Sequence, residues 1–270
     1  MLRSTVLVSL VVVFGAILLA KPASAQPGAE RAESELRRER RSLARDAAAR
    51  DTVLNTAAAV PEAGTLRVTA NGGADRSRED GRLAGVFGAG LLWSIGGGFA
   101  TEAAATVHGG GAHPDVALRW QGLRQATAGI DLTTVLRYGT FGSELRTVSG
   151  GEIGAQIAIG RSLGRLRLLG NAMIARGVIV RTDVDAMGGA AALFDVIDGW
   201  RLGLDGRART EVEDTYKTAE DIGRPMQLEG GLVSAHRYGP AYIQVFGGWQ
   251  VPRGLAAPGP VVLATASVDF

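Results

Sequence analysis

Three histidines are the residues best suited to acid–base or metal chemistry in this sequence, which contains no cysteine. His108 precedes two glycines, His113 precedes Pro114 and Asp115, and His236 precedes an arginine. Hydrolysis by a serine nucleophile would need a serine at a suitable spacing from a histidine, and none is present. His108 and His113 could share a metal ion, but the pattern has low specificity. We therefore predict no enzyme activity, no catalytic residue, no metal site and no cofactor.

Charged residues that recur two positions apart form a second candidate site. In an extended strand, residues two positions apart share one face. Arginines on a common face could attract anions, whereas carboxylates on that face could pair with the arginines and neutralise them. The ionisable residues expected to share this face are Arg119, Arg137, Arg165, Arg167, Arg201, Arg207, Arg209, Glu102, Asp131, Glu152, Asp205 and Glu229. Their chemistry depends on the elements that carry them.

The composition favours β-structure and excludes several classes of protein. The chain has 270 residues, enough for one large β domain and an appendage. Its 39 glycines suit turns and tightly packed strands better than helices. No run of about twenty apolar residues follows the N-terminus, so no membrane-spanning helix is expected. The net charge of +2 is too small to indicate a nucleic-acid-binding protein.

Residues 1–25 predict a cleaved secretory signal peptide. One positive charge at Arg3 precedes an apolar run at residues 6–20, and Ala23-Ser24-Ala25 supplies the Ala-x-Ala pattern of a cleavage site. A retained membrane anchor is the alternative, although the apolar run is short for a span. A lipoprotein is excluded because the chain has no cysteine to carry the lipid.

From residue 63 to residue 270, alternating apolar and polar residues predict twelve β-strands. An even number is usual in a single-chain bacterial barrel, and most segments are long enough to cross a bilayer at a tilt. The connections are alternately short and long, as expected when turns lie at one end of a barrel and loops at the other. The predicted strands are residues 65–71, 83–95, 99–108, 115–123, 129–138, 152–160, 165–176, 189–197, 200–210, 227–236, 241–250 and 261–270.

The last ten residues form the pattern that is most specific to one class of protein. Alternate positions Val262, Ala264, Ala266, Val268 and Phe270 share one face, and the sequence ends on the aromatic ring. This pattern resembles the C-terminal strand of Gram-negative outer-membrane β-barrel proteins, without identifying a specific family. The resemblance implies an all-β fold, namely a transmembrane antiparallel up-and-down β-barrel of about twelve strands. It also implies contact with outer-membrane lipid and insertion by the barrel-assembly machinery, with Phe270 as the recognised end. Residues 261–270 would then pair with residues 65–71 to close the barrel.

The two faces of the predicted strands differ in polarity. One face is apolar and includes Val116, Leu118 and Leu202, while the other carries the charged residues. The charged face is expected to line the lumen, because ionisable groups facing lipid at mid-depth would cost about 2–4 kcal/mol each. Rings near strand ends, including Trp93 and Tyr242, predict an interfacial girdle. A soluble exported β-sandwich is the alternative, but it would not explain the alternation of loop lengths.

Between the signal peptide and the barrel, residues 26–62 predict a charged α-helix. Residues 29–59 lack glycine and consist mostly of strong helix formers, and Pro61 would end the helix. A narrow apolar stripe repeats every eleven residues along it. Three roles are open. The helix could be a solvated periplasmic extension that self-associates through the stripe. It could plug the lumen, as in autotransporter translocator domains, or contact the anionic membrane face through the arginines of residues 37–41.

The sequence favours a narrow outer-membrane pore for small solutes. A weak preference for anions is expected, because seven arginines and five carboxylates share the predicted lumen face. A non-conducting structural barrel is the first alternative, with the helix or the external loops binding a partner. An autotransporter-like translocator is the second, although no passenger segment lies between the signal peptide and the helix.

Overall fold

The structure is a computed structural model that describes residues 52–76, 83–108, 111–139, 151–178, 184–213, 226–252 and 257–270. The predicted signal peptide and residues 26–51 of the predicted helix lie outside this part of the chain. Within it, no helix has the length and apolar character needed to cross a membrane.

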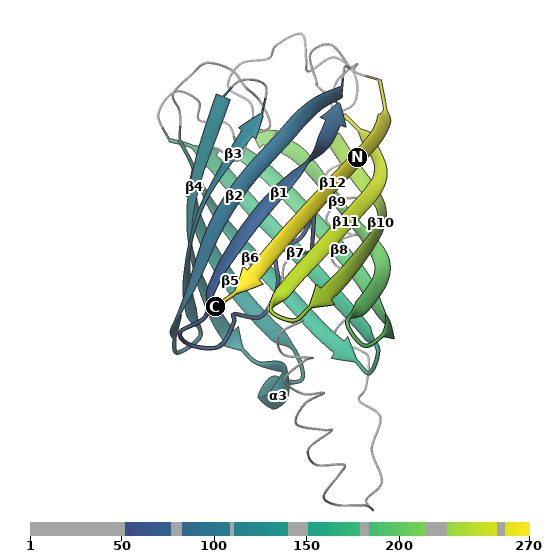
Figure 1. Cartoon of the computed structure of the whole chain (residues 1–270). Helices are drawn as coiled ribbons and strands as arrows, with labels where there is room; N and C mark the ends of the chain where they lie inside the picture. Colours follow the sequence, from purple (N-terminus) through teal and green to yellow (C-terminus); the bar gives the residue numbers. More distant parts are fainter. Residues whose placement is uncertain are drawn as a thin grey trace, which may run out of the picture.

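Twelve antiparallel strands form one closed barrel, as predicted (Figure 1). Each strand pairs with its neighbours in sequence, and β1 pairs with β12 to complete the ring. The strands are β1 Leu66–Arg76, β2 Leu83–Gly96, β3 Phe99–His108, β4 Gly111–Leu123, β5 Asp131–Gly139, β6 Glu152–Leu163, β7 Leu166–Gly177, β8 Val184–Ile197, β9 Trp200–Glu213, β10 Met226–Tyr238, β11 Ala241–Val251 and β12 Gly259–Asp269. Because the ring is closed, no strand offers an unpaired edge.

The pairing of the first and last strands confirms the predicted closure. The register runs from Arg67 opposite Asp269 to Ala74 opposite Val262. Beyond the last paired position, the backbone N–H of Phe270 donates to the carbonyl oxygen of Leu66 at 2.9 Å. Closure therefore extends over more of β1 than the predicted residues 65–71.

Tight turns join the strands at the end of the barrel where β12 finishes (Figure 1). Gly164 and Gly199 occupy turns with φ values of 61° and 80°, a left-handed conformation that glycine adopts without steric cost. The connection between β4 and β5 holds the short helix α3, Gln125–Ala128, which ends at Gly129 with φ 77°. The predicted alternation of short and long connections fails at one place: β3 ends at His108 and β4 begins at Gly111, so this connection, expected to be long, is shorter than the one between β4 and β5 at the turn end.

The outer surface of the barrel is apolar. Leu232 on β10 is 68% exposed and pairs with Leu204 on β9, which is 61% exposed. Trp93, Trp120 and other rings are exposed near strand ends, as a membrane girdle requires. A soluble β-sandwich would bury such side chains, so this alternative is excluded.

The predicted locations of one aromatic residue and one histidine were wrong. Tyr242 was expected in the girdle, but it is 6% exposed and faces the lumen beside Gln244. His113 was expected in a loop, whereas β4 begins earlier, at Gly111. The error has a physical cause: His113 and Asp115 point into a polar lumen, where a polar side chain does not mark the end of a strand.

The predicted helix is also wrong for its described part. Residues 52–59 form bends without helical hydrogen bonding. The hydroxyl of Thr52 accepts a hydrogen bond from the Asn55 N–H at 3.0 Å and donates to the Asn55 carbonyl at 3.3 Å. Such side-chain bonds compete with helix formation. Barrel side chains bind further backbone groups of this stretch, as described next.

Candidate functional site in the barrel lumen

Residues 52–61, here called the lumen segment, lie inside the barrel. Ala57 and Ala58 are 0% and 1% exposed, and each hydrogen bond described below reaches a lumen-facing position of a strand. Part of the N-terminal region is therefore lumenal, one of the three locations considered from the sequence. Of these, the plug agrees with the described residues, although they form no helix.

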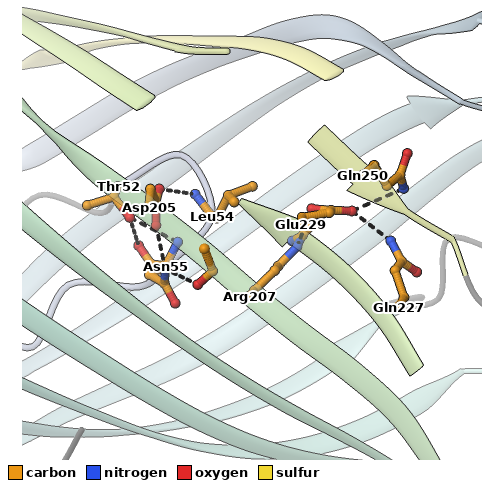
Figure 2. A network of polar contacts seen from close by, with 9 residues as sticks. Thr52, Leu54, Asn55, Asp205, Arg207, Gln227, Glu229 and Gln250 are labelled. Carbon is orange, nitrogen blue, oxygen red and sulfur yellow. Dashed lines mark hydrogen bonds and ion pairs between the residues drawn. The ribbon is translucent and has the colours of Figure 1, made fainter. Parts of the chain in front are cut away.

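Asp205 on β9 holds one end of the lumen segment (Figure 2). Its Oδ2 accepts the backbone N–H of Leu54 at 2.9 Å, and its Oδ1 accepts the Asn55 side-chain amide at 2.5 Å. The same amide donates to the carbonyl oxygen of Gly206 at 3.2 Å. Asp205 is 3% exposed, so the lumen segment supplies donors that this buried carboxylate requires.

Four further barrel side chains bind the rest of the lumen segment. Asn171 donates to the Thr56 carbonyl at 3.1 Å, and the Thr133 hydroxyl donates to the Ala58 carbonyl at 2.8 Å. The Val60 N–H donates to Gln121 Oε1 at 3.2 Å, and the Ser94 hydroxyl donates to the Pro61 carbonyl at 2.8 Å. These partners come from β2, β4, β5 and β7, so the segment is tied across the lumen.

Apolar contacts complete the docking of the lumen segment. Leu54 packs in a buried cluster with Leu193, Val233, Phe246 and Val261. A second cluster joins Ala58 to three residues of β6, β7 and β8, which are Ala158, Leu169 and Ala191. Burial of a leucine side chain contributes about 1.5–3 kcal/mol.

Two lumen-facing glycines leave room for the segment. A Cβ added at Gly160 would lie 2.9 Å from the Cβ of Ala58, and one added at Gly189 would meet the side-chain oxygen of Asn55 first. A larger residue at either position would therefore compete with the lumen segment for space. The wall of the barrel therefore fits the segment at two points, beside Asn55 and beside Ala58.

A cavity of about 480 Å³ occupies the lumen beside the segment. Residues 52–56 form part of its wall, and lumen-facing residues of the strands form the rest. Volumes of about 300–1,000 Å³ are typical of sites that hold a small molecule. The lumen is thus partly filled by the chain itself and partly available to a solute.

Ion pairs line one wall of the cavity. The Arg119 guanidinium lies 2.5 Å from a carboxylate oxygen of Glu102, and Arg119 is 2% exposed. Arg137 reaches both Glu102, at 3.5 Å, and Asp115, at 3.7 Å. Two arginines and two carboxylates therefore share a network across β3, β4 and β5.

A second network lies on β9, β10 and β11 (Figure 2). Glu229 accepts from Arg207 at 2.7 Å, from Gln227 at 2.6 Å and from Gln250 at 3.2 Å. On β9, Arg209 pairs with Asp185 of β8. A buried carboxylate with several charged and polar donors is stabilised as the anion, so Glu229 balances the charge of Arg207.

Eleven of the twelve residues predicted on the charged face lie on the lumen side of the strands. Arg201 pairs with Asp195, and Asp131 accepts from Gln121 and from the Gln125 N–H, both at 2.9 Å. Arg165 is the exception, because it lies in the exposed turn between β6 and β7. The lumen residues are Arg119, Arg137, Arg167, Arg201, Arg207, Arg209, Glu102, Asp131, Glu152, Asp205 and Glu229.

Sequence reasoning missed four carboxylates that pair with lumen arginines. They are Asp115, Asp185, Asp195 and Asp269. Asp185 fell in a predicted loop, and the others lie at or near strand ends. Extending the predicted strand at residues 189–197 back to Val184 would have found Asp185. Asp115, Asp195 and Asp269 lay inside predicted strands, and following the alternation to the strand ends would have added them to the lumen face.

Two of the three histidines lie on opposite faces of the barrel wall. His113 lines the cavity, whereas His236 lies on the outer surface between the rings of Trp200 and Tyr238, with centroids 5.4 Å and 6.0 Å away. Among the described residues, no three His, Asp or Glu side chains are placed to hold a metal ion.

The sequence matches no protein-family model and no curated protein. Among solved structures, it is similar to an outer-membrane channel from Pseudomonas putida F1, with a TM-score of 0.52 and 12% identity over 78% of this chain and 97% of that one. It is also similar to the KdgM porin, with a TM-score of 0.52 and 7% identity over 76% of this chain and 99% of that one. The chain therefore has the fold of an outer-membrane β-barrel, as the sequence of its final strand predicted.

Proposed function

We propose that the protein is a channel of the Gram-negative outer membrane that passes small polar solutes, and that the lumen segment narrows its path. One observation carries the proposal: a cavity of about 480 Å³ with charged walls lies inside a barrel whose outer surface is apolar. A barrel that served only as an anchor would have no need of such a space.

The outward side chains support the membrane location. Leu204, Leu232 and Ile174 are each more than half exposed, and water would disfavour so continuous an apolar surface. The similar structures include one described as an outer-membrane channel and one described as a porin. Export by the leader at residues 1–25 and insertion of β12 by the barrel-assembly machinery belong to the same proposal.

The lumen segment supports the narrow path. It crosses between opposite walls and holds Leu54 against four apolar residues of β8, β10, β11 and β12. Solutes must pass beside the segment or displace it. The full chain is therefore expected to conduct weakly, and a chain without the segment is expected to conduct more.

Planar-bilayer recording tests the function. Chains that begin at residue 26 and at residue 63 are refolded and inserted under identical conditions. We expect small current steps from the longer chain and larger steps from the shorter one. If neither chain gives steps, although both show heat-modifiable gel migration, the channel is excluded.

A non-conducting anchor is the second candidate function, and the filled part of the lumen favours it. In that case the hydrogen bonds of residues 52–61 would serve stability alone. The shorter chain would then unfold at a lower temperature but would still pass no current.

A further inference from the structure

The walls of the cavity are balanced in charge. Among the residues that the structure describes, five arginines and five Asp or Glu residues line it. The pairs are close, with Arg207 at 2.7 Å from Glu229 and Arg119 at 2.5 Å from Glu102. The arginine excess that predicted an anion preference is thus absent from the cavity.

An ion gains little from such a cavity. Moving a charge out of water is costly unless an opposite charge compensates it, and here each carboxylate network already contains its arginine. A chloride ion near Arg207 would compete with Glu229, and a cation near Glu229 would compete with Arg207. Neither sign of charge is favoured.

The same wall can form hydrogen bonds with a solute that carries hydroxyl groups. Paired arginines and carboxylates place hydrogen-bond donors beside acceptors, and a hydroxyl group both donates and accepts. Two acceptors on the cavity wall, Asp115 Oδ1 and Gln156 Oε1, receive no hydrogen bond from the described residues, and Gln156 is 3% exposed. Buried acceptors of this kind are satisfied by a solute that brings donors.

We infer that the cavity selects uncharged solutes that carry several hydroxyl groups, and that the Arg207–Glu229 pair sets this preference. The inference rests on the proposed channel function and names its class of solute. Removal of one member of the pair leaves one uncompensated charge in the wall. Glu229→Gln makes the wall positive, and Arg207→Gln makes it negative.

Glucose, gluconate and glucosamine provide matched probes, because they share a six-carbon polyhydroxylated skeleton and differ in charge. Efflux of each radiolabelled compound is measured from proteoliposomes that contain the full chain. A second preparation carries Asp205→Asn, which is expected to loosen the lumen segment without removing it. We expect glucose to leave several-fold faster than either charged compound in both preparations.

The two substitutions should change efflux in opposite directions. Glu229→Gln is expected to raise gluconate efflux several-fold, and Arg207→Gln to raise glucosamine efflux several-fold, with glucose changed less in both. If gluconate leaves through the unmodified chain as fast as glucose or faster, the inference is overturned but the proposed channel function stands. The same holds if both variants change the efflux of all three probes equally. If no probe leaves either preparation, the proposed channel fails and the inference fails with it.

Discussion

The backbone N–H of Leu54 donates to Oδ2 of Asp205 at 2.9 Å, although 151 positions separate the two residues in the chain. The bond joins the first described residues to a strand late in the barrel. Since Asp205 also accepts from Asn55, this one carboxylate fixes both the path and the orientation of the lumen segment. Replacing one of the two carboxylate oxygens of Asp205 by an amide group is therefore a small change that should release the segment.

Asp205→Asn should loosen the lumen segment and enlarge the current steps of the full chain. An asparagine can still accept from Leu54, but its amide group would face the amide of Asn55. Losing a buried hydrogen bond to a charged group costs about 1.5–3 kcal/mol. Planar-bilayer recording measures the effect. Asp195→Asn is the control, because Asp195 pairs with Arg201 and no contact with the segment is seen. Equal conductance of the two variants would argue against this role of Asp205.

Gly189→Val should displace the segment from the wall of the barrel. A Cβ at Gly189 would meet the Asn55 side chain, which is held by Asp205 and Gly206, and overpacking of this kind costs about 1–3 kcal/mol. Hydrogen exchange at the amides of Leu54 and Val60 is expected to accelerate. Gly247→Val is the matched control, because nothing lies within 4 Å of a Cβ at that outward position. Unchanged exchange in Gly189→Val would show that the segment does not press on β8.

Arg67→Gln should weaken the closure of the barrel. Arg67 on β1 binds Asp269 on β12 through two hydrogen bonds, at 2.7 Å and 3.0 Å. Their loss is expected to cost about 1.5–3 kcal/mol and to lower the temperature at which the folded gel band converts to the unfolded one. Arg165→Gln, in the exposed turn, should leave that temperature unchanged. If both variants convert at the same temperature, the pair contributes nothing measurable to closure.

Leu232→Arg should destabilise the protein in bilayers far more than Thr265→Arg. Leu232 is outward and exposed, whereas Thr265 lines the cavity. An arginine facing lipid near the midplane costs about 2–4 kcal/mol, and an arginine in a polar lumen avoids that cost. Denaturant unfolding in lipid vesicles measures both free energies. A larger loss for Thr265→Arg would reverse the assignment of the two faces.

Much of the fold was predictable, because every strand of a membrane barrel alternates apolar residues facing lipid with polar residues facing the lumen. Alternation at Val116 and Leu118 against Arg119 identifies both faces of β4, and alternation in the last ten residues identifies β12 as a strand. These signals are local in sequence, and each is independent of the rest of the chain. The twelve strands followed from them, and the pairing of the first strand with the last followed from the need to leave no unpaired edge.

The contents of the lumen were less predictable. Asp185 was assigned to a loop because aspartate often ends a strand, yet it faces Arg209 across the pair β8–β9. The predicted excess of arginine arose because carboxylates were left off the lumen face: Asp185 lay outside a predicted strand, and Asp115 and Asp195 lay near the ends of predicted strands. The helix prediction failed at residues 52–59 because barrel groups, such as Asp205 and Thr133, bind backbone atoms that a helix would pair internally. No local pattern encodes a contact across 151 positions.

The position and effect of the lumen segment are tested most directly by a reducible disulfide bond between the segment and the barrel wall. The chain has no cysteine, so Ala58→Cys and Gly160→Cys introduce a single pair. Their Cβ atoms would start 2.9 Å apart, and a small shift brings them to the 3.5–4.5 Å found in disulfides. The pair is placed in the Asp205→Asn chain, and single-channel conductance is recorded before and after reduction. We predict that the oxidised protein conducts as weakly as the unmodified chain and that reduction restores the larger steps of Asp205→Asn. Failure of the disulfide to form, or equal conductance in the oxidised and reduced protein, would contradict a lumen segment that limits the path.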